Sequence, residues 1–218
     1  MIALENLTKV FRLEGTAKTV ADNITAVFPT GRSVGLLGRN GAGKSTLLQM
    51  IAGTMMPSSG RIVTTGTISW PVGFAGSFHP DLTGIQNTRF VARIYGADTD
   101  ELVHFVEDFA GLGVHFRLPV RTYSSGMRSR LAFGMSMGIA FDTYLVDEVT
   151  SVGDAAFRSR SNEVFHARMA NAGAVVVSHS MGMIRELCDC GAVLEHGRLT
   201  FFDNVEDAIA RHSRNMLG

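Results

Sequence analysis

The sequence predicts an α/β fold in three parts: a core built on a mostly parallel sheet, an antiparallel β layer from the N-terminal third, and an inserted α-helical subdomain. Three observations support this prediction. Short apolar runs, each followed by a helical pattern, recur along the chain, as expected of parallel strands covered on both faces. Stretches of alternating polarity between turn residues dominate the N-terminal third. Helical patterns without an intervening strand occupy residues 79–140.

The apolar runs of the core are VGLL (34–37), YLVD (144–147) and AVVVS (174–178). The helical patterns KSTLLQMIAG, AAFRSRSNEVFHARMA and MGMIRELCD follow them in that order. In folds of this kind, ligands bind at the carboxyl ends of the strands. We therefore predict a core formed by residues 1–78 and 141–218, with the functional residues along one edge of its sheet.

The remaining segments predict the other two parts. NITAVF and RIVTTGTISW alternate apolar and polar residues, which indicates strands of the antiparallel layer. TGIQNTRFVARIYG and DELVHFVEDFAG are typical of amphipathic helices, so we predict a helical subdomain at 79–140 inserted within a single domain spanning 1–218. NVEDAIARHSRNM predicts an amphipathic helix near the end of the chain.

Composition narrows the classes of function. Lysine plus arginine equals aspartate plus glutamate at 20 each, which removes the main electrostatic argument for a nucleic-acid partner. MIALENLTKVF lacks a basic segment followed by an apolar core, so we expect no signal peptide. The longest mostly apolar run, Leu131 to Phe141, is shorter than the ~20 residues that a membrane span needs. Cys188 and Cys190 match no zinc or redox spacing, and we expect reduced thiols.

GRNGAGKST fits the phosphate-loop motif G-x-x-x-x-G-K-[ST] at every fixed position, between a strand pattern and a helix pattern. Glycines let such a loop turn its N–H groups toward a triphosphate, and the helix N-terminus adds partial positive charge. Lys44 is predicted to reach the β- and γ-phosphates, and Ser45 to ligand Mg²⁺. By itself the motif indicates that a nucleoside triphosphate binds, which is common to kinases, GTPases, helicases and transport ATPases. The predicted nucleotide-binding residues are Gly38, Arg39, Asn40, Gly41, Ala42, Gly43, Lys44, Ser45 and Thr46.

Polar residues follow two of the predicted strands. Asp147 ends the run YLVD, where a metal-bridging carboxylate belongs. Glu148 is predicted to orient or deprotonate the attacking water, a role whose loss costs on the order of 10²- to 10⁴-fold in rate. An acidic pair after a strand can also cap a helix, but the phosphate loop favours the catalytic interpretation. His179 follows AVVVS and is predicted to contact the γ-phosphate rather than metal.

The order of motifs resembles the ABC-transporter ATPases over nearly the whole chain: a phosphate loop, YSSGM before a helix, LVDE on a strand, then a histidine after another strand. This resemblance implies ATP and Mg²⁺ as ligands and a homodimer that holds two ATP molecules between its chains. Phe11 matches the aromatic residue that stacks on adenine, and Ser151 to Asp154 match a loop that links the two sites. The stretch matching the family's signature, which would bind the nucleotide of the partner chain, comprises Tyr123, Ser124, Ser125, Gly126 and Met127.

Departures from the family pattern narrow the resemblance. The usual Leu-Ser-Gly-Gly-Gln reads YSSGM here, and the usual Asp-Glu-Pro-Thr-Ser-Ala-Leu-Asp reads DEVTSVGD. His79 stands where the family has a glutamine that touches Mg²⁺ and senses the membrane subunit. The resemblance implies a coupling role for His79, and whether its imidazole contacts Mg²⁺ or water stays open. These motifs resemble the polysaccharide-export branch, and ISWPVGFAGSF and FVARIY resemble capsular polysaccharide exporters of Gram-negative bacteria.

The resemblance implies an ATP-hydrolysing subunit that energises export of lipid-linked capsular polysaccharide across the inner membrane. It would lie on the cytoplasmic face, bound to two integral-membrane permease subunits, with residues 79–95 gripping their short cytoplasmic helices. Exporters of O-antigen, teichoic acid or another polysaccharide are the alternatives, and the chain end at Gly218, without a carbohydrate-binding domain, favours capsule over O-antigen. A soluble ABC ATPase acting on DNA or ribosomes is less favoured, because no coiled-coil insertion or second ATPase half is present. A small-molecule kinase would not explain YSSGM.

Overall fold

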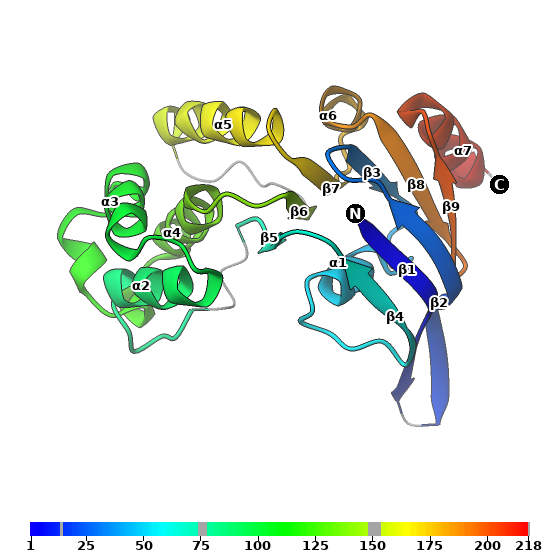
Figure 1. The fold of residues 1–218 in the computed structure, drawn as a ribbon, viewed down its shortest axis with the longest axis horizontal. Helices are drawn as coiled ribbons and strands as arrows, with labels where there is room; N and C mark the ends of the chain where they lie inside the picture. Colours follow the sequence, from blue (N-terminus) through cyan, green and yellow to red (C-terminus); the bar gives the residue numbers. More distant parts are fainter. Residues whose placement is uncertain (14, 74–77, 148–153, 218) are drawn as a thin grey trace. The chain divides into compact units, whose positions relative to one another are not determined.

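The computed structural model describes residues 1–13, 15–73, 78–147 and 154–217. They form two compact units, whose elements Figure 1 labels. The first, here called the sheet unit, contains the described residues of 1–71, 141–148 and 171–218. The second, the helical unit, contains those of 72–140 and 149–170.

An antiparallel sheet forms one layer of the sheet unit, with the strand order β2-β1-β4. β1 (Ile2–Leu13) pairs with β2 (Thr16–Phe28) on one side and with β4 (Ser59–Thr64) on the other. In the second half of β2, Ile24 and Phe28 are buried while Thr25 and Val27 are exposed, which is the alternation expected of a sheet with one covered face. The predicted antiparallel layer is confirmed.

The second layer is a six-stranded sheet with the order β5-β6-β7-β3-β8-β9. Its first five strands run parallel, and β9 closes an antiparallel hairpin with β8. Every residue of β3 and β7 is buried, as the continuous apolar runs predicted. The strands are β5 (Ile68–Pro71), β6 (Thr143–Asp147), β7 (Gly173–Val177), β3 (Ser33–Leu37), β8 (Cys190–Glu195) and β9 (Arg198–Phe202).

β5 corrects one prediction, because ISW was assigned to the antiparallel layer and instead runs parallel to β6. Ser69 and Trp70 are both buried, and the backbone N–H of Leu145 in β6 donates to Ser69 Oγ at 2.9 Å. Alternation alone does not say which sheet an edge strand joins; these contacts with β6 decide it. The hairpin of β8 and β9 was not predicted.

The hydrophobic core of the sheet unit includes side chains from both sheets and from α1 (Lys44–Ile51). Leu7 and Phe28 come from the antiparallel layer, Leu36 and Val175 from the parallel strands, and Leu48 from α1. Burying a side chain of this size stabilises the fold by about 1.5–3 kcal/mol. The core therefore fixes the start of α1, and the loop before it, against the sheet.

Two further helices belong to the sheet unit, α6 (Met181–Leu187) and α7 (Val205–Leu217). Arg185 on α6 donates to Glu206 on α7 at 2.7 Å, which ties the two helices together. Cys188 and Cys190 are free and buried, as expected of reduced thiols. Burial raises the pKa of the Cys188 thiol to about 12, so it stays protonated at neutral pH.

The helical unit contains α2 (Gly84–Tyr95), α3 (Thr99–Ala110), α4 (Ser125–Gly138) and α5 (Ala155–Met169), with short 3₁₀ turns at Gly113–Arg117 and Val120–Thr122. Thr83 and Gln86 form a capping box at the start of α2, and Asp98 caps α3. Among the described residues, no helix is long and apolar enough to cross a membrane.

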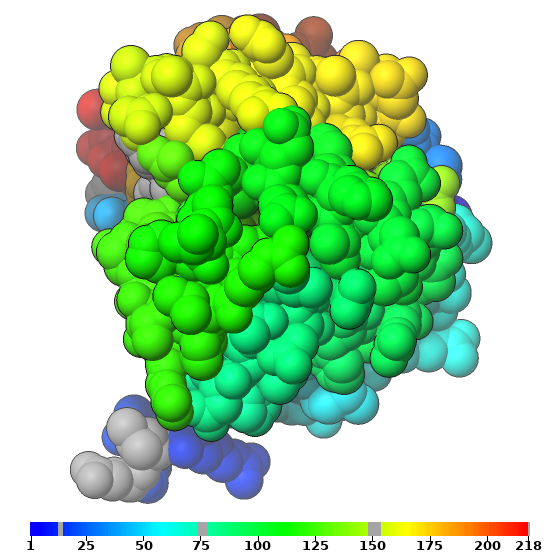
Figure 2. Space-filling model, turned by 90° about the vertical axis from the view of Figure 1, so that its left-hand side faces the viewer, coloured from blue at the N-terminus to red at the C-terminus, as the bar shows by residue number. Residues whose placement is uncertain are grey.

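α5 lies in the helical unit, whereas the sequence grouped residues 141–218 with the core. The ring of Phe157 contacts the ring of Phe109 on α3, with centroids 5.3 Å apart. Arg160 pairs with Asp108, also on α3. In the surface view of Figure 2, the yellow atoms of α5 accordingly lie against the green atoms of the other helices.

Candidate functional site

The loop between β3 and α1 depends on glycine at defined positions. Gly43 caps α1 with φ 106°, in the left-handed region. A Cβ at Gly43 would lie 3.0 Å from the Cβ of Val20, and one at Gly38 would lie 2.4 Å from the carbonyl oxygen of Leu194. At Gly38 and Gly43 the loop therefore lies so close to β8 and β2 that a side chain would not fit.

Val20 reaches the loop because of a β-bulge. The register of β1 and β2 passes from the pair Lys9 and Ala21 to the pair Val10 and Thr19, which leaves Val20 as the extra residue. Such bulges re-aim side chains and are common beside functional sites. Here the bulge brings Val20, which is buried, against Gly43.

Lys44 is the first residue of α1, and its ammonium folds back over the loop. Nζ donates to the carbonyl oxygen of Gly38 at 2.8 Å and to that of Arg39 at 3.1 Å. Burial, followed by the positive charge of Lys44, lowers the pKa of His212 on α7. The loop therefore carries a fixed positive charge suited to a polyanion.

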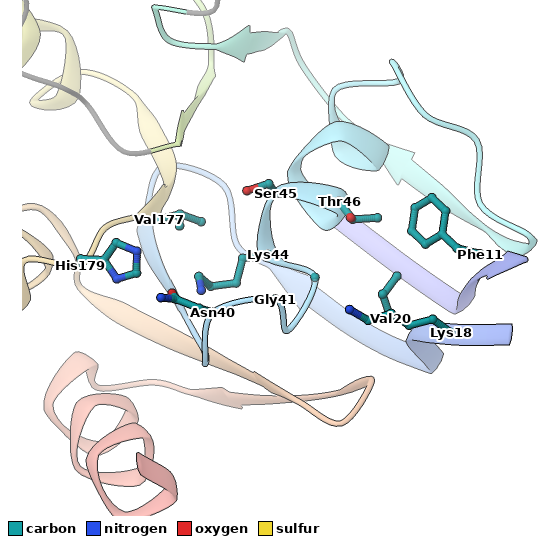
Figure 3. Close-up of a pocket in the computed structure, with 11 residues that line it drawn as sticks. Phe11, Lys18, Val20, Asn40, Gly41, Lys44, Ser45, Thr46, Val177 and His179 are labelled. Carbon is teal, nitrogen blue, oxygen red and sulfur yellow. The ribbon is translucent and has the colours of Figure 1, made fainter. Parts of the chain in front are cut away.

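A cavity of about 500 Å³ lies along this loop (Figure 3). Lys18, Val20 and Val177 are among its lining residues, although no motif marked them in the sequence. In Figure 3, Phe11 lies at one end and His179 at the other, with Lys44 and Ser45 between them. Eight predicted site residues line this cavity: Phe11, Asn40, Gly41, Gly43, Lys44, Ser45, Thr46 and His179.

Other predicted nucleotide-binding residues lie beside this cavity. Arg39 and Ala42 line a smaller neighbouring cavity of about 270 Å³, which shares Asn40 and Gly41 with the first. Asp147 ends β6 and pairs in the sheet with Val177, a lining residue of the main cavity. Parallel strands bring their carboxyl ends to one edge, so Asp147 lies on the edge that carries the cavity. Glu148 and Ser151 lie outside the described residues.

The predicted signature residues begin α4 in the helical unit. Ser124 caps the helix, since its Oγ accepts from the backbone N–H of Met127 at 3.2 Å. Tyr123 is buried, and its hydroxyl donates to the carbonyl oxygen of His115 at 2.6 Å. Burial raises the pKa of Tyr123, which keeps it a neutral donor. Ser124 and Ser125 are exposed at the helix N-terminus.

Asp154 caps α5 and links it to α4. Its Oδ1 accepts from the backbone N–H of Phe157 at 2.9 Å, and its Oδ2 accepts from Arg130 at 2.9 Å. The guanidinium of Arg130 also lies over the ring of Phe157, 4.8 Å from its centroid. The cap and then the Arg130 hydrogen bond lower the pKa of Asp154. Arg130 was not predicted, because nothing in its local sequence shows the helix it contacts.

His79 lies in the helical unit, just before α2. Its backbone N–H donates to the side-chain oxygen of Asn87 at 2.9 Å, and the amide nitrogen of Asn87 donates back to the His79 carbonyl at 3.2 Å. Asn87 is buried on α2, so the backbone at His79 is held to that helix.

The sheet unit therefore defines a class of protein: an α/β nucleoside-triphosphate-binding domain with a phosphate loop. The ABC transporter family matches residues 21–151, and the chain belongs to that family. It is an ATP-binding ATPase, as the order of its motifs predicted.

Similar proteins over almost the whole length extend this assignment. The polysialic acid transport ATP-binding protein KpsT of Escherichia coli is 48% identical, over 99% of this chain and 100% of its own. The capsule polysaccharide export ATP-binding protein CtrD of Neisseria meningitidis serogroup B is 40% identical, over 95% of this chain and 96% of its own. The O-antigen export system ATP-binding protein RfbE of Yersinia enterocolitica is 37% identical, over 85% and 80%.

The fold is also shared with solved structures. A dimeric ATP-binding cassette in a post-hydrolysis state, bound to ADP and phosphate, superposes with a TM-score of 0.76 at 18% identity, over 94% of this chain and 99% of that chain. At this identity the likeness establishes the fold alone.

Proposed function

We propose that this chain is the ATP-hydrolysing subunit of an exporter of capsular polysaccharide. The observation that carries the proposal is its similarity, over nearly the full length, to KpsT and CtrD, whose names specify polysialic acid and capsule polysaccharide. Similarity to the O-antigen protein RfbE is lower and covers less of both chains.

The cavity supports one orientation of ATP. Phe11 and His179 lie at opposite ends of the cavity (Figure 3). Adenine would therefore stack on Phe11, and the γ-phosphate would lie toward His179. The triphosphate between them would follow the loop, with the Lys44 ammonium at the β- and γ-phosphates. Glu148 would act as the general base toward water, and His179 would position phosphate and water.

The residues present fit Mg²⁺. Ser45 lines the cavity and Asp147 lies at the same sheet edge, which provides a hydroxyl and one carboxylate. Within the described part of the chain, no group of three or more His, Cys, Asp or Glu side chains could hold a metal. Mg²⁺ bound to nucleotides typically uses one or two carboxylates together with phosphate oxygens and water. When bound, it would neutralise charge on the phosphates.

Hydrolysis in this proposal needs a second copy of the chain, with ATP held between the phosphate loop of one and the signature residues of the other. The Ser124 hydroxyl accepts from Met127 N–H, so its own proton can donate to a phosphate oxygen. Two-fold symmetry would make both sites alike. Ser151 to Asp154 would link them, with Asp154 acting through its contacts to α5 and Arg130.

The helical unit would dock on integral-membrane permease subunits at the cytoplasmic face of the inner membrane. Phe90 and Ile94, one turn apart on α2, are 57% and 59% exposed. An exposed apolar pair of this kind is suited to a partner helix. His79 precedes the same helix, so closure of the ATPase dimer would reach the permease through α2.

Glu148→Gln tests the mechanism. Without the general base, ATP should stay bound and hold two chains together, so the variant should elute as a dimer with ATP and as a monomer without it. Size-exclusion chromatography with light scattering measures this. Lys44→Met in the same background is the matched control and should remain monomeric. A Glu148→Gln variant that binds ATP yet stays monomeric would rule out the shared site.

The export function needs a test in cells. Deletion of the gene should remove polysaccharide from the surface, and wild-type chain should restore it while Glu148→Gln should not. Surface polysaccharide detected by its sugar composition is the measurement. Normal capsule together with altered lipopolysaccharide would point instead to O-antigen export.

A further inference from the structure

Two of the three lysines of the chain line the nucleotide cavity, and the third contacts Phe11, which also lines it. The sequence has 20 lysines and arginines, and only Lys9, Lys18 and Lys44 are lysines. Lys18 and Lys44 line the cavity directly. Lys44 belongs to the phosphate loop, whereas Lys9 and Lys18 flank Phe11 on the hairpin of β1 and β2 and belong to no motif.

Lys9 is held in place at Phe11 by two contacts. Its ammonium lies over the Phe11 ring, 5.1 Å from the centroid. The same ammonium donates to the carbonyl oxygen of Met56 at 2.7 Å, which joins the hairpin to the segment before β4. Phe11 itself is 39% exposed.

Lys9 and Lys18 stand in different relations to Phe11, because Lys9 contacts the ring and Lys18 lines the cavity beside it. Lys18 is the cross-strand partner of Phe11 and lines the cavity with it. Lys9, in contrast, is not among the described residues that line the cavity. An aromatic ring has two faces, and an ammonium over one of them leaves the other to stack on a base.

We propose that Lys9 is a positioning residue for the adenine base, acting through Phe11. This inference rests on the proposed orientation of ATP and adds a residue to it. The cation attracts the ring electrostatically, and its bond to Met56 fixes the side of the hairpin on which the ring stands. A ring ordered before binding loses less conformational entropy when the base arrives.

The test compares two ligands on the full-length chain, ATP and inorganic tripolyphosphate, by isothermal titration calorimetry in EDTA at about 0.15 M salt, where charges are screened beyond ~8 Å. Lys9→Met keeps the apolar stem and removes the ammonium. We expect the Kd for ATP to rise about two- to fivefold, the range of an exposed cation–π contact. The Kd for tripolyphosphate, which has no base, should not change. Lys9→Arg should restore ATP affinity.

Lys18→Met is the matched control, because it makes the same chemical change on the same hairpin but faces the cavity. It should raise the Kd for ATP and for tripolyphosphate alike.

In a Phe11→Ala background, Lys9→Met should have no further effect on the Kd for ATP. Equal weakening of both ligands by Lys9→Met, an unchanged Kd for ATP, or an undiminished effect without Phe11 would each overturn the inference. If Phe11→Ala itself leaves ATP affinity intact, the proposed base site fails instead.

Discussion

The phosphate loop and the signature residues both precede a helix, yet their glycines are explained differently. Gly43 has φ 106°, and its Cβ would crowd Val20, so this chain's own fold requires glycine there. Gly126 lies in the first turn of α4, and the nearest described atom that a Cβ would meet is Ser124 Oγ, at 4.0 Å. Among the described residues, no contact therefore requires glycine at 126.

This difference indicates which molecule surrounds each loop when ATP is bound: this chain itself or a second copy. The phosphate loop is shaped by the sheet unit around it, through Val20 and Leu194. Among the signature residues, Tyr123 is held by its hydrogen bond to His115 and Ser124 by the helix cap, while no neighbouring described side chain lies closer than 4.0 Å to a Cβ at Gly126. A glycine with no close described neighbour leaves room for close approach by another molecule, as proposed for the partner's nucleotide.

The largest expected effect is at Ser124. Ser124→Arg places a bulky side chain where the partner's nucleotide would bind, so hydrolysis should fall by more than about 10²-fold, as when a transition-state donor is removed. ATP binding to a single chain should stay largely intact. Phosphate release and calorimetric titration of ATP measure the two properties. Equal loss of binding would mean that this loop serves its own chain's site.

The next largest effect is expected at Gly43, and it should differ from the effect of the same substitution at Gly126. Gly43→Ala forces a left-handed backbone on alanine and crowds Val20, so the free energy of unfolding should fall by about 1–3 kcal/mol. ATP affinity should fall with it, because the loop must shift. Urea unfolding and ATP titration are the measurements.

Gly126→Ala is the matched control for this comparison. Alanine is favoured over glycine in helices by up to ~1 kcal/mol, so unfolding should become no easier. Hydrolysis should nevertheless fall about 10- to 100-fold, because the methyl group would obstruct a donor facing the partner's phosphate. Destabilisation by Gly126→Ala, or normal hydrolysis, would contradict the proposed difference between the loops.

The smallest effect concerns Asp154. Its pKa is lowered in the folded chain by the α5 cap and Arg130, so its ionised form stabilises the fold at pH values above the ordinary 3.8. Asp154→Asn keeps the cap and loses the charge. Wild type should therefore be more stable than the variant near pH 7, and this advantage should shrink as pH falls below 3.8. Melting temperatures across pH, with Arg130→Met as control, measure it. A constant difference would exclude the ion pair as its source.

Much of the fold was predictable, and the failures share a cause. The runs around Leu36, Val146 and Val176 became buried parallel strands, because their apolar character extends over both faces of a strand. β5 was assigned to the wrong sheet, and the β8–β9 hairpin was not predicted. Strand patterns show that a segment is extended, but its partner is chosen by packing and hydrogen bonds from elsewhere in the chain.

The residues of the candidate site also fall into two groups, those that a local motif predicts and those that only a contact between distant segments brings together. Lys44 and Ser45 were predictable, because the motif places them and a helix start brings them to the cavity. Lys9 meets Met56, and Arg130 meets Asp154, across 47 and 24 residues. No local pattern encodes such pairs. They arise when the hairpin folds over the loop before β4, or when two helices pack side by side.

The sequence by itself determined the chemistry of this protein: a phosphate loop, acidic residues after a strand, and a signature stretch in the order of an ABC ATPase. Each of these features is a short segment, and its residue types and their spacing along the chain are enough to recognise it. The tertiary structure alone decided that α5 belongs to the helical unit, that Val20 packs against Gly43 of the phosphate loop, and that the Lys9 ammonium lies over the Phe11 ring. Those outcomes depend on which distant surfaces bury each other, and burial is a property of the whole folded chain.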